Sequence, residues 1–310
     1  DMALRVTGDG WAAFVAWAAC VGPPVLFYNA FLYSEPVVAL CVAVALHRLL
    51  WPRRDVDAAL AALALAALPW LHVRMTLTAV ALGGFALVRL RGRQRRVFAV
   101  TAFTMAVAYA LHQFWAYGTL SPFARYGGAV PAPIENATPW RTLVGLWVDG
   151  AYGLLPYAPV FLLAPLGLAI VARGLLNSRP PQASAEERAL AWALLCTTAG
   201  VLLPVLGWRN WWGFSPPARF TIPFVPVLAL VVAVRLAASS GRGLARWRWP
   251  LLAAGFALAL FLFAEPRSML MVNGREGTAR GLDALAGAGT FSRYLPFVSS
   301  RLGSSTPPWE

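Results

Sequence analysis

The chain has 310 residues, of which 59% are hydrophobic and only 13% are charged. A soluble domain carries roughly a quarter charged residues, so this composition excludes an ordinary soluble fold. The formal net charge of +13 could suit nucleic acid, but the 26 basic residues are all arginines, clustered between long apolar blocks. Arginine clusters of this kind flank membrane helices. We therefore expect an all-α, polytopic integral membrane protein that contacts the lipid bilayer and has no nucleic-acid partner.

Apolar runs close to the length that crosses a bilayer, about 20 residues, recur along the chain. They predict about nine transmembrane helices, at residues 11–30, 35–51, 57–73, 75–91, 97–117, 157–173, 189–207, 220–236 and 249–265. These runs define a transmembrane domain over residues 1–265. An outer-side tail over residues 266–310 follows, with one short helix expected near 277–287.

The arginines predict the orientation of this domain. One set of alternate loops holds most of them: Arg5, Arg48, Arg53 and Arg54, and the arginines of segments 89–96, 173–188 and 235–248. The other set holds Arg74, Arg125, Arg141, Arg209 and Arg219. The positive-inside rule assigns the richer set to the cytoplasm. With the arginine- and alanine-rich usage typical of a GC-rich genome, we expect a multi-pass protein of the bacterial cytoplasmic membrane, with its larger loops extracytoplasmic.

The longest outer loop, residues 118–156, is rich in glycine, proline and aromatic residues. Trp140 and Trp147 lie seven residues apart and share one face if the segment is helical. This spacing predicts a short amphipathic helix lying on the membrane surface. Asp149 follows it, and two interpretations stay open: a local turn or cap, or a carboxylate of a site.

Glu35 stands at the outer start of an apolar run, directly before Pro36. An acid at a helix N-terminus is favoured by the helix dipole, and proline is common in the first turn. An ionisable group near membrane depth is also costly and therefore marks a candidate site. A structural acid and a carboxylate facing an outer cavity are both consistent with this position.

Another outer boundary carries Trp70, His72 and Arg74 within the segment PWLHVR. Interfacial tryptophan and a long cationic side chain are ordinary membrane anchors. An arginine beside a histidine also suits a phosphate or diphosphate group, since the guanidinium makes bidentate contacts.

The densest constellation is the segment 208–220, WRNWWGFSPPARF, which contains Asn210, Trp211, Trp212 and Arg219. Aromatic anchoring explains the tryptophans alone. Aromatic rings beside arginine and asparagine also form carbohydrate- or phosphate-binding surfaces, because the rings stack on sugars while the polar groups orient hydroxyls. Both interpretations stay open.

Familiar soluble-enzyme motifs are absent from the sequence, including a Walker loop, GxSxG, HExxH and CxxC. His47, His72 and His112 lie far apart, so a histidine-based metal site is not expected. The three cysteines lie inside apolar blocks and indicate packing rather than metal binding.

Four segments in order resemble the GT-C superfamily of membrane glycosyltransferases, of the protein-mannosyltransferase and aminoarabinose-transferase type. They are LFYNAFLYSEPVVAL, LPWLHVRMTLTAVAL, DGAYGLLPYAPVFLLAPLGL and WRNWWGFSPPARFTIPFVPVLAL. The resemblance spans roughly residues 1–265. The family's signature acid lies in a first outer loop that has no counterpart here, so we expect a fragment lacking the N-terminal catalytic loop.

The resemblance implies sugar transfer from a polyprenyl-phosphate donor to a glycan, lipid or protein acceptor on the extracytoplasmic side. A carboxylate would serve as base, and cations would stabilise the leaving phosphate. Arg219 and Arg74 are the expected phosphate contacts, with His72 and Asn210 beside them. Glu35 and Asp149 are candidates for contacting acceptor, sugar or a divalent metal, whose requirement stays open.

Tyr152, Trp211 and Trp212 are expected to shape the cavity for the sugar or lipid. Two alternatives are kept: a non-catalytic membrane relative, and a transporter or flippase of a lipid-linked substrate. Transporters favour repeated halves and charges near mid-membrane. This sequence has no internal repeat, and its charges gather at the ends of the apolar runs.

Overall fold

The computed structural model describes residues 1–29, 33–124, 139–177, 185–206, 218–238, 246–264 and 282–283. These residues form helices and connecting turns with no β-strand, so the all-α prediction is confirmed for the described part of the chain. The α-helices are α1 (Met2–Thr7), α2 (Gly10–Val21), α3 (Val25–Asn29), α4 (Glu35–Leu50), α5 (Asp55–Leu71), α6 (Thr76–Arg89), α7 (Gly92–Tyr117), α8 (Pro139–Val148), α9 (Ala164–Asn177), α10 (Ala185–Leu206), α11 (Val225–Ala237) and α12 (Arg248–Ala264). Three 3-10 turns, η1 (Val73–Met75), η3 (Pro159–Leu163) and η4 (Arg219–Phe224), precede α6, α9 and α11.

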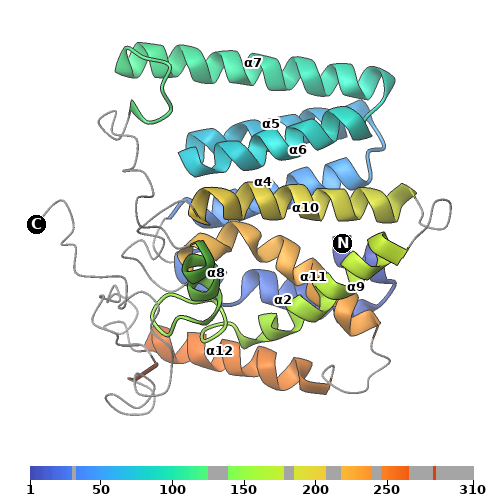
Figure 1. Cartoon of the computed structure of the whole chain (residues 1–310), viewed down its shortest axis with the longest axis vertical. Coiled ribbons are helices and arrows are strands. Elements are labelled where there is room, and N and C mark those ends of the chain that lie inside the picture. Colours follow the sequence, from blue (N-terminus) through green and yellow to red (C-terminus); the bar gives the residue numbers. More distant parts are fainter. Residues whose placement is uncertain are drawn as a thin grey trace, which may run out of the picture.

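The long helices lie side by side in successive layers (Figure 1). Helix α7 forms one edge and packs on α5 and α6, while α5 and α6 pack in turn on α4 and α10. Helix α11 packs against α2, α9 and α4, and α12 lies at the opposite edge against η3 and α2. The architecture is therefore a helical bundle whose elements share roughly one axis.

Helix α11 forms the buried centre of the bundle. Its residues from Val225 to Ala233 are all buried, on every side of the helix. Gly167 of α9 lies so close to Val231 that a side-chain carbon at this position would collide with the Val231 carbonyl oxygen. Small residues let helix backbones approach in this way, and such contacts drive helix association where no water is present.

Every one of the nine predicted spans falls largely on helix, but nine helices of spanning length are not found. Among the described residues, three helical stretches are long and apolar enough to cross a membrane: Gly92–Tyr117, Ala185–Leu206 and Arg219–Ala237. The first predicted span, 11–30, is divided into α2 and α3 at Gly22, Pro23 and Pro24. Proline has no N–H to continue the helical ladder, which explains why an unbroken apolar run gives a 12-residue helix there.

Helix α8 forms in the loop where a short amphipathic helix was predicted. Thr142, Gly145 and Leu146 are buried against the bundle, whereas Trp140, Leu143 and Val144 are exposed. Trp147 packs partly against the core. The exposed face of α8 is thus apolar, as a helix lying at a membrane surface requires.

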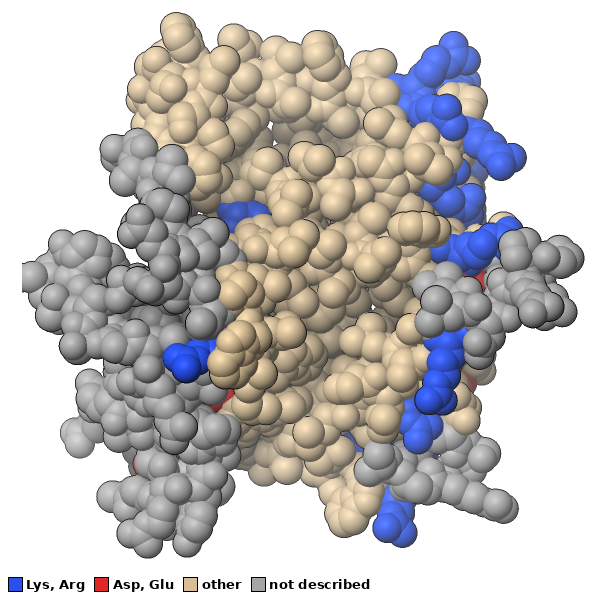
Figure 2. Space-filling model, viewed as in Figure 1, with Lys and Arg blue, Asp and Glu red and all other residues tan. Residues whose placement is uncertain are grey.

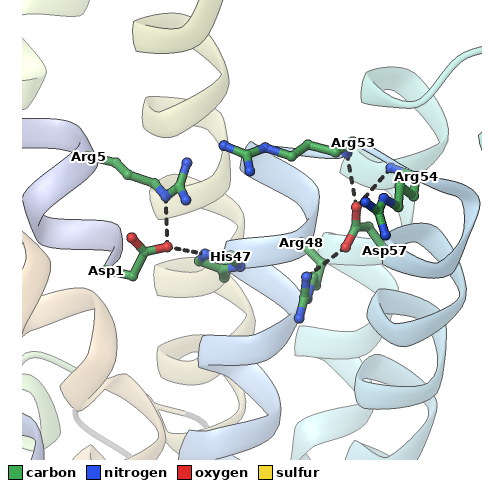
Figure 3. Close-up of polar contacts among 7 residues, drawn as sticks. All are labelled: Asp1, Arg5, His47, Arg48, Arg53, Arg54 and Asp57. Atoms are coloured by element: carbon green, nitrogen blue, oxygen red, sulfur yellow. Dashed lines mark hydrogen bonds and ion pairs between the residues drawn. The ribbon is translucent and has the colours of Figure 1, made fainter.

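Arginine side chains gather along one edge of the bundle, separated from the opposite edge by a broad uncharged belt (Figure 2). This edge includes the turn between α4 and α5, which Asp57 organises (Figure 3). The Asp57 carboxylate accepts hydrogen bonds from the Arg48 guanidinium at 2.7 Å and from the backbone N–H groups of Arg53 and Arg54 at 3.0 and 2.9 Å. Beside it, Asp1 pairs with Arg5 and His47.

Replacing Asp57 with Asn should lower the free energy of unfolding by about 2 kcal/mol, the range measured for buried hydrogen bonds to charged groups. Asp57 is buried and holds three donors at the start of α5. Reversible unfolding in detergent measures the change. The matched control is Asp55→Asn, because the Asp55–Arg93 pair is exposed and should change stability by less than about 0.5 kcal/mol. Equal effects of the two substitutions would contradict the assignment.

Candidate functional site

The candidate site is centred on the carboxylate of Glu35, the first residue of α4. Its Oε1 atom accepts a hydrogen bond from Arg219 Nε at 2.6 Å and lies 3.5 Å from Arg74 Nη2. The Glu35 side chain is 1% exposed and that of Arg74 is 3% exposed. Two arginines from distant parts of the sequence therefore converge on one buried acid.

Three local structures bring these side chains together. Ser34 and Pro36 start α4 so that Glu35 lies in its first turn, where the helix dipole favours a negative charge. His72 ends α5, and its Nδ1 accepts a hydrogen bond from the Arg74 backbone N–H at 3.3 Å, which begins η1. Ala218 adopts a left-handed conformation, with φ of 63°, and turns the chain into η4 at Arg219.

Aromatic rings line the two guanidinium groups. The Arg74 Cζ lies 4.1 Å from the ring centroid of Phe220, and the Arg219 Cζ lies 4.8 Å from that of Tyr33. Tyr33 in turn packs edge-on against the buried Tyr28, at 5.2 Å between centroids. Stacking on aromatic faces suits arginine, whose planar guanidinium is weakly hydrated. The rings contact the faces of both guanidiniums, and the N–H groups in the guanidinium plane stay oriented for hydrogen bonds.

The two guanidinium groups differ in how far they reach the surface. Both face the Glu35 carboxylate, and charged groups removed from water are costly and mark a candidate site. The Arg219 side chain is 23% exposed, unlike those of Glu35 and Arg74, and is therefore the group that an incoming anion can reach.

Asp149 has a local structural role. Its Oδ1 accepts hydrogen bonds from the backbone N–H groups of Ala151 and Tyr152 at 2.9 and 3.0 Å, which closes the turn after α8. The same turn supports the site from behind, because the Tyr152 carbonyl oxygen accepts a hydrogen bond from the N–H of Ala218 at 2.9 Å. Tyr157 adds a hydrogen bond from its hydroxyl to the Gly150 carbonyl oxygen at 2.9 Å.

The structure thus unites Glu35, Arg74 and Arg219, three residues singled out separately from the sequence. His72 positions Arg74, and Tyr152 contacts the turn before Arg219 through its backbone. Asn210, Trp211 and Trp212 lie outside the described residues. Sequence reasoning missed Tyr33 and Phe220 as neighbours of the arginines, although each stands within two residues of a candidate.

No metal-binding cluster accompanies the site within the described ranges. There, no group of three or more histidine, cysteine, aspartate or glutamate residues is arranged to hold a metal ion. At Glu35, the described residues bring two guanidinium groups to one carboxylate.

A double-mutant cycle tests whether Glu35 and Arg219 act as one unit. Glu35→Gln alone removes the carboxylate that pairs with the Arg74 and Arg219 guanidiniums, and should destabilise the protein by about 3 kcal/mol. With Arg219→Gln also present, part of this loss should disappear, giving a coupling energy of at least about 1 kcal/mol in unfolding measurements. Arg141, whose guanidinium lies over Trp140, supplies the control: Arg141→Gln and Glu35→Gln should add within about 0.5 kcal/mol. Additive effects in the Glu35–Arg219 pair would contradict the coupling.

Comparison of the chain with protein-family models, with curated proteins and with solved structures finds no match in any of the three.

Proposed function

We propose that the protein is a multi-pass membrane glycosyltransferase of the GT-C type, which transfers a sugar from a polyprenyl-phosphate donor to an acceptor on the extracytoplasmic side. The observation that carries the proposal is the convergence of Arg74 and Arg219 on Glu35. The sequence resemblance to GT-C enzymes suggests the reaction. The two arginines suggest which part of the donor the site recognises, namely its phosphate.

The paired guanidinium groups of Arg74 and Arg219 suit the phosphate of a lipid-linked sugar. Arginine presents a planar fork of N–H donors that matches phosphate oxygens bidentately. Arg219 reaches the phosphate because it is the exposed member of the pair, whereas Arg74 contributes charge from beneath and Glu35 holds both guanidiniums in orientation. Fixed cations of this kind stabilise a leaving phosphate as the bond to it breaks, since no reorganisation is required at that moment.

The two ends of α4 support the proposed sidedness. Glu35 begins the helix, and His47 and Arg48 lie in its last turn, about 18 Å away at 1.5 Å per residue. The edge rich in arginine (Figure 2) faces the cytoplasm under the positive-inside rule. The Glu35 site then opens on the outer side, where a polyprenyl donor reaches it from the membrane. The shorter apolar helices complete the bundle: α2 and α9 pack against α11, and α12 packs against α2.

In the reaction, an acceptor hydroxyl attacks the anomeric carbon of the sugar, the bond from that carbon to the phosphate oxygen breaks, and the hydroxyl proton passes to a carboxylate base. Glu35 serves in this scheme as the residue that orients the arginines, because its Oε1 is bonded to Arg219. The resemblance assigns the base to the family's signature acid, in a first outer loop for which this sequence has no counterpart.

Arg219→Ala should lower donor affinity at least tenfold, since a charge-assisted contact to phosphate contributes more than about 1.4 kcal/mol. Arg219→Lys should restore part of it, because lysine keeps the charge and loses the bidentate geometry. The measurement is binding and transfer of radiolabelled polyprenyl-phosphate sugars by the full-length protein in membranes. Arg141→Ala is the control, because this arginine on α8 lies outside the cluster.

Unchanged donor binding by the Arg219→Ala variant would contradict the proposal that Arg219 binds the donor phosphate. Absence of transfer from every donor, in a well-folded full-length protein, would instead favour a non-catalytic relative. Movement of the lipid-linked sugar across the bilayer without transfer would favour a flippase.

A further inference from the structure

A second charged feature lies at the opposite end of the bundle from Glu35, in the turn between α6 and α7. Five of the eight residues from 89 to 96 are arginines: Arg89, Arg91, Arg93, Arg95 and Arg96. All of them except Arg89 are exposed. The segment therefore presents a dense cluster of positive charge where α7 begins, which the proposed glycosyltransferase site does not use.

The local structure offers this cluster little compensation. Among the described residues, its one ion pair joins Arg93 Nε to Asp55 Oδ2, at 2.7 Å, and is largely exposed. Arg89 and Arg95 donate to the carbonyl oxygens of Leu50 and Leu90. The first turn of α7 contains no acid, although a helix N-terminus favours negative charge. The arginines lie at the positive end of the helix dipole, so a bound anion would stabilise this end of α7.

An apolar stripe runs along α7 away from the arginines. Val100, Phe103, Val107, Leu111 and Phe114 recur at helical spacing, and their exposed fractions range from 40% to 71%. From Val100 to Phe114 the stripe extends about 21 Å at 1.5 Å per residue, which exceeds one leaflet of a hydrocarbon core about 30 Å thick. Helix α7 forms an edge of the bundle (Figure 1), so no described helix covers this stripe.

We propose that the arginine cluster 89–96 and the stripe of α7 together form a binding site for an anionic phospholipid. The phosphate headgroup contacts the exposed arginines, and the acyl chain lies along Val100, Phe103 and Val107. Clustered arginines beside a membrane helix attract anionic lipid. The adjoining apolar stripe suits an acyl chain, which a nucleic acid does not have, so the combination favours a lipid. The proposal is independent of the glycosyltransferase activity and of the Glu35 site.

The test measures lipid binding to the purified full chain in neutral detergent by native mass spectrometry, with phosphatidylglycerol and phosphatidylcholine as probes. Wild-type protein should retain phosphatidylglycerol preferentially. Arg91→Gln combined with Arg96→Gln should reduce its affinity at least tenfold, because each arginine near an anionic headgroup contributes roughly a factor of five. Both side chains are exposed, and neither forms a hydrogen bond with a described residue, so the double variant should melt at the wild-type temperature.

The matched control removes two arginines from the far edge of the bundle, Arg246→Gln with Arg248→Gln, next to Trp247 and Trp249. A site on α7 predicts less than a twofold change in the control. Phe103→Ser should weaken retention as well, because it interrupts the apolar stripe. Equal binding of the two lipids by wild-type protein would overturn the proposal, and so would equal losses in the two double variants. Tighter binding of a short DNA oligonucleotide than of phosphatidylglycerol to the same arginines would also overturn it.

Discussion

The buried carboxylate of Glu35 is the interaction on which one end of this bundle depends. It joins α4 to the α5–α6 turn through Arg74 and to the start of α11 through Arg219, across 184 residues of sequence in the second case. A buried charge is tolerated only when it is paired and hydrogen-bonded. The two arginines pair with Glu35 through its Oε1, although no described residue gives a hydrogen bond to its buried Oε2. The aromatic faces of Tyr33 and Phe220 hold the arginines in turn. Three segments are thereby fixed around one cluster of ion pairs.

The two ends of the bundle use charge in different ways. At the end with most arginines, acids at turns hold the arginines: Asp55 pairs with Arg93 at the surface, and the buried Asp57 holds Arg48 between α4 and α5 (Figure 3). At the other end, among the described residues, the buried Arg74 and the partly exposed Arg219 share one buried acid, Glu35. Exposed pairs in water contribute little to stability, whereas buried ones create strong local fields. This contrast is why the Glu35 end is the candidate for chemistry and the arginine-rich end for orientation and lipid contact.

Composition and hydrophobic runs predicted the helical class and the positions of the helical segments, because those features depend on local residue content. Helix lengths were predicted less well: Gly22, Pro23 and Pro24 break an apolar run that hydropathy alone treats as continuous. Glu35, Arg74 and Arg219 were each selected for being ionisable at a boundary. Their meeting could not be predicted, because it depends on how α4, η1 and η4 pack, and no local pattern specifies that. For Asp149, two alternatives stood open, and only the backbone geometry of the turn showed its hydrogen bonds to Ala151 and Tyr152.

The most direct test of the central claim is a cryo-electron microscopy structure of the full-length protein with a non-transferable polyprenyl-phosphonate sugar. The account predicts the phosphonate within hydrogen-bond distance of the Arg219 guanidinium, with Arg74 and Glu35 behind it and the polyprenyl chain leaving into the membrane layer. Density for the analogue at another part of the bundle, with the Glu35–Arg219 pair unchanged and inaccessible to it, would contradict the account.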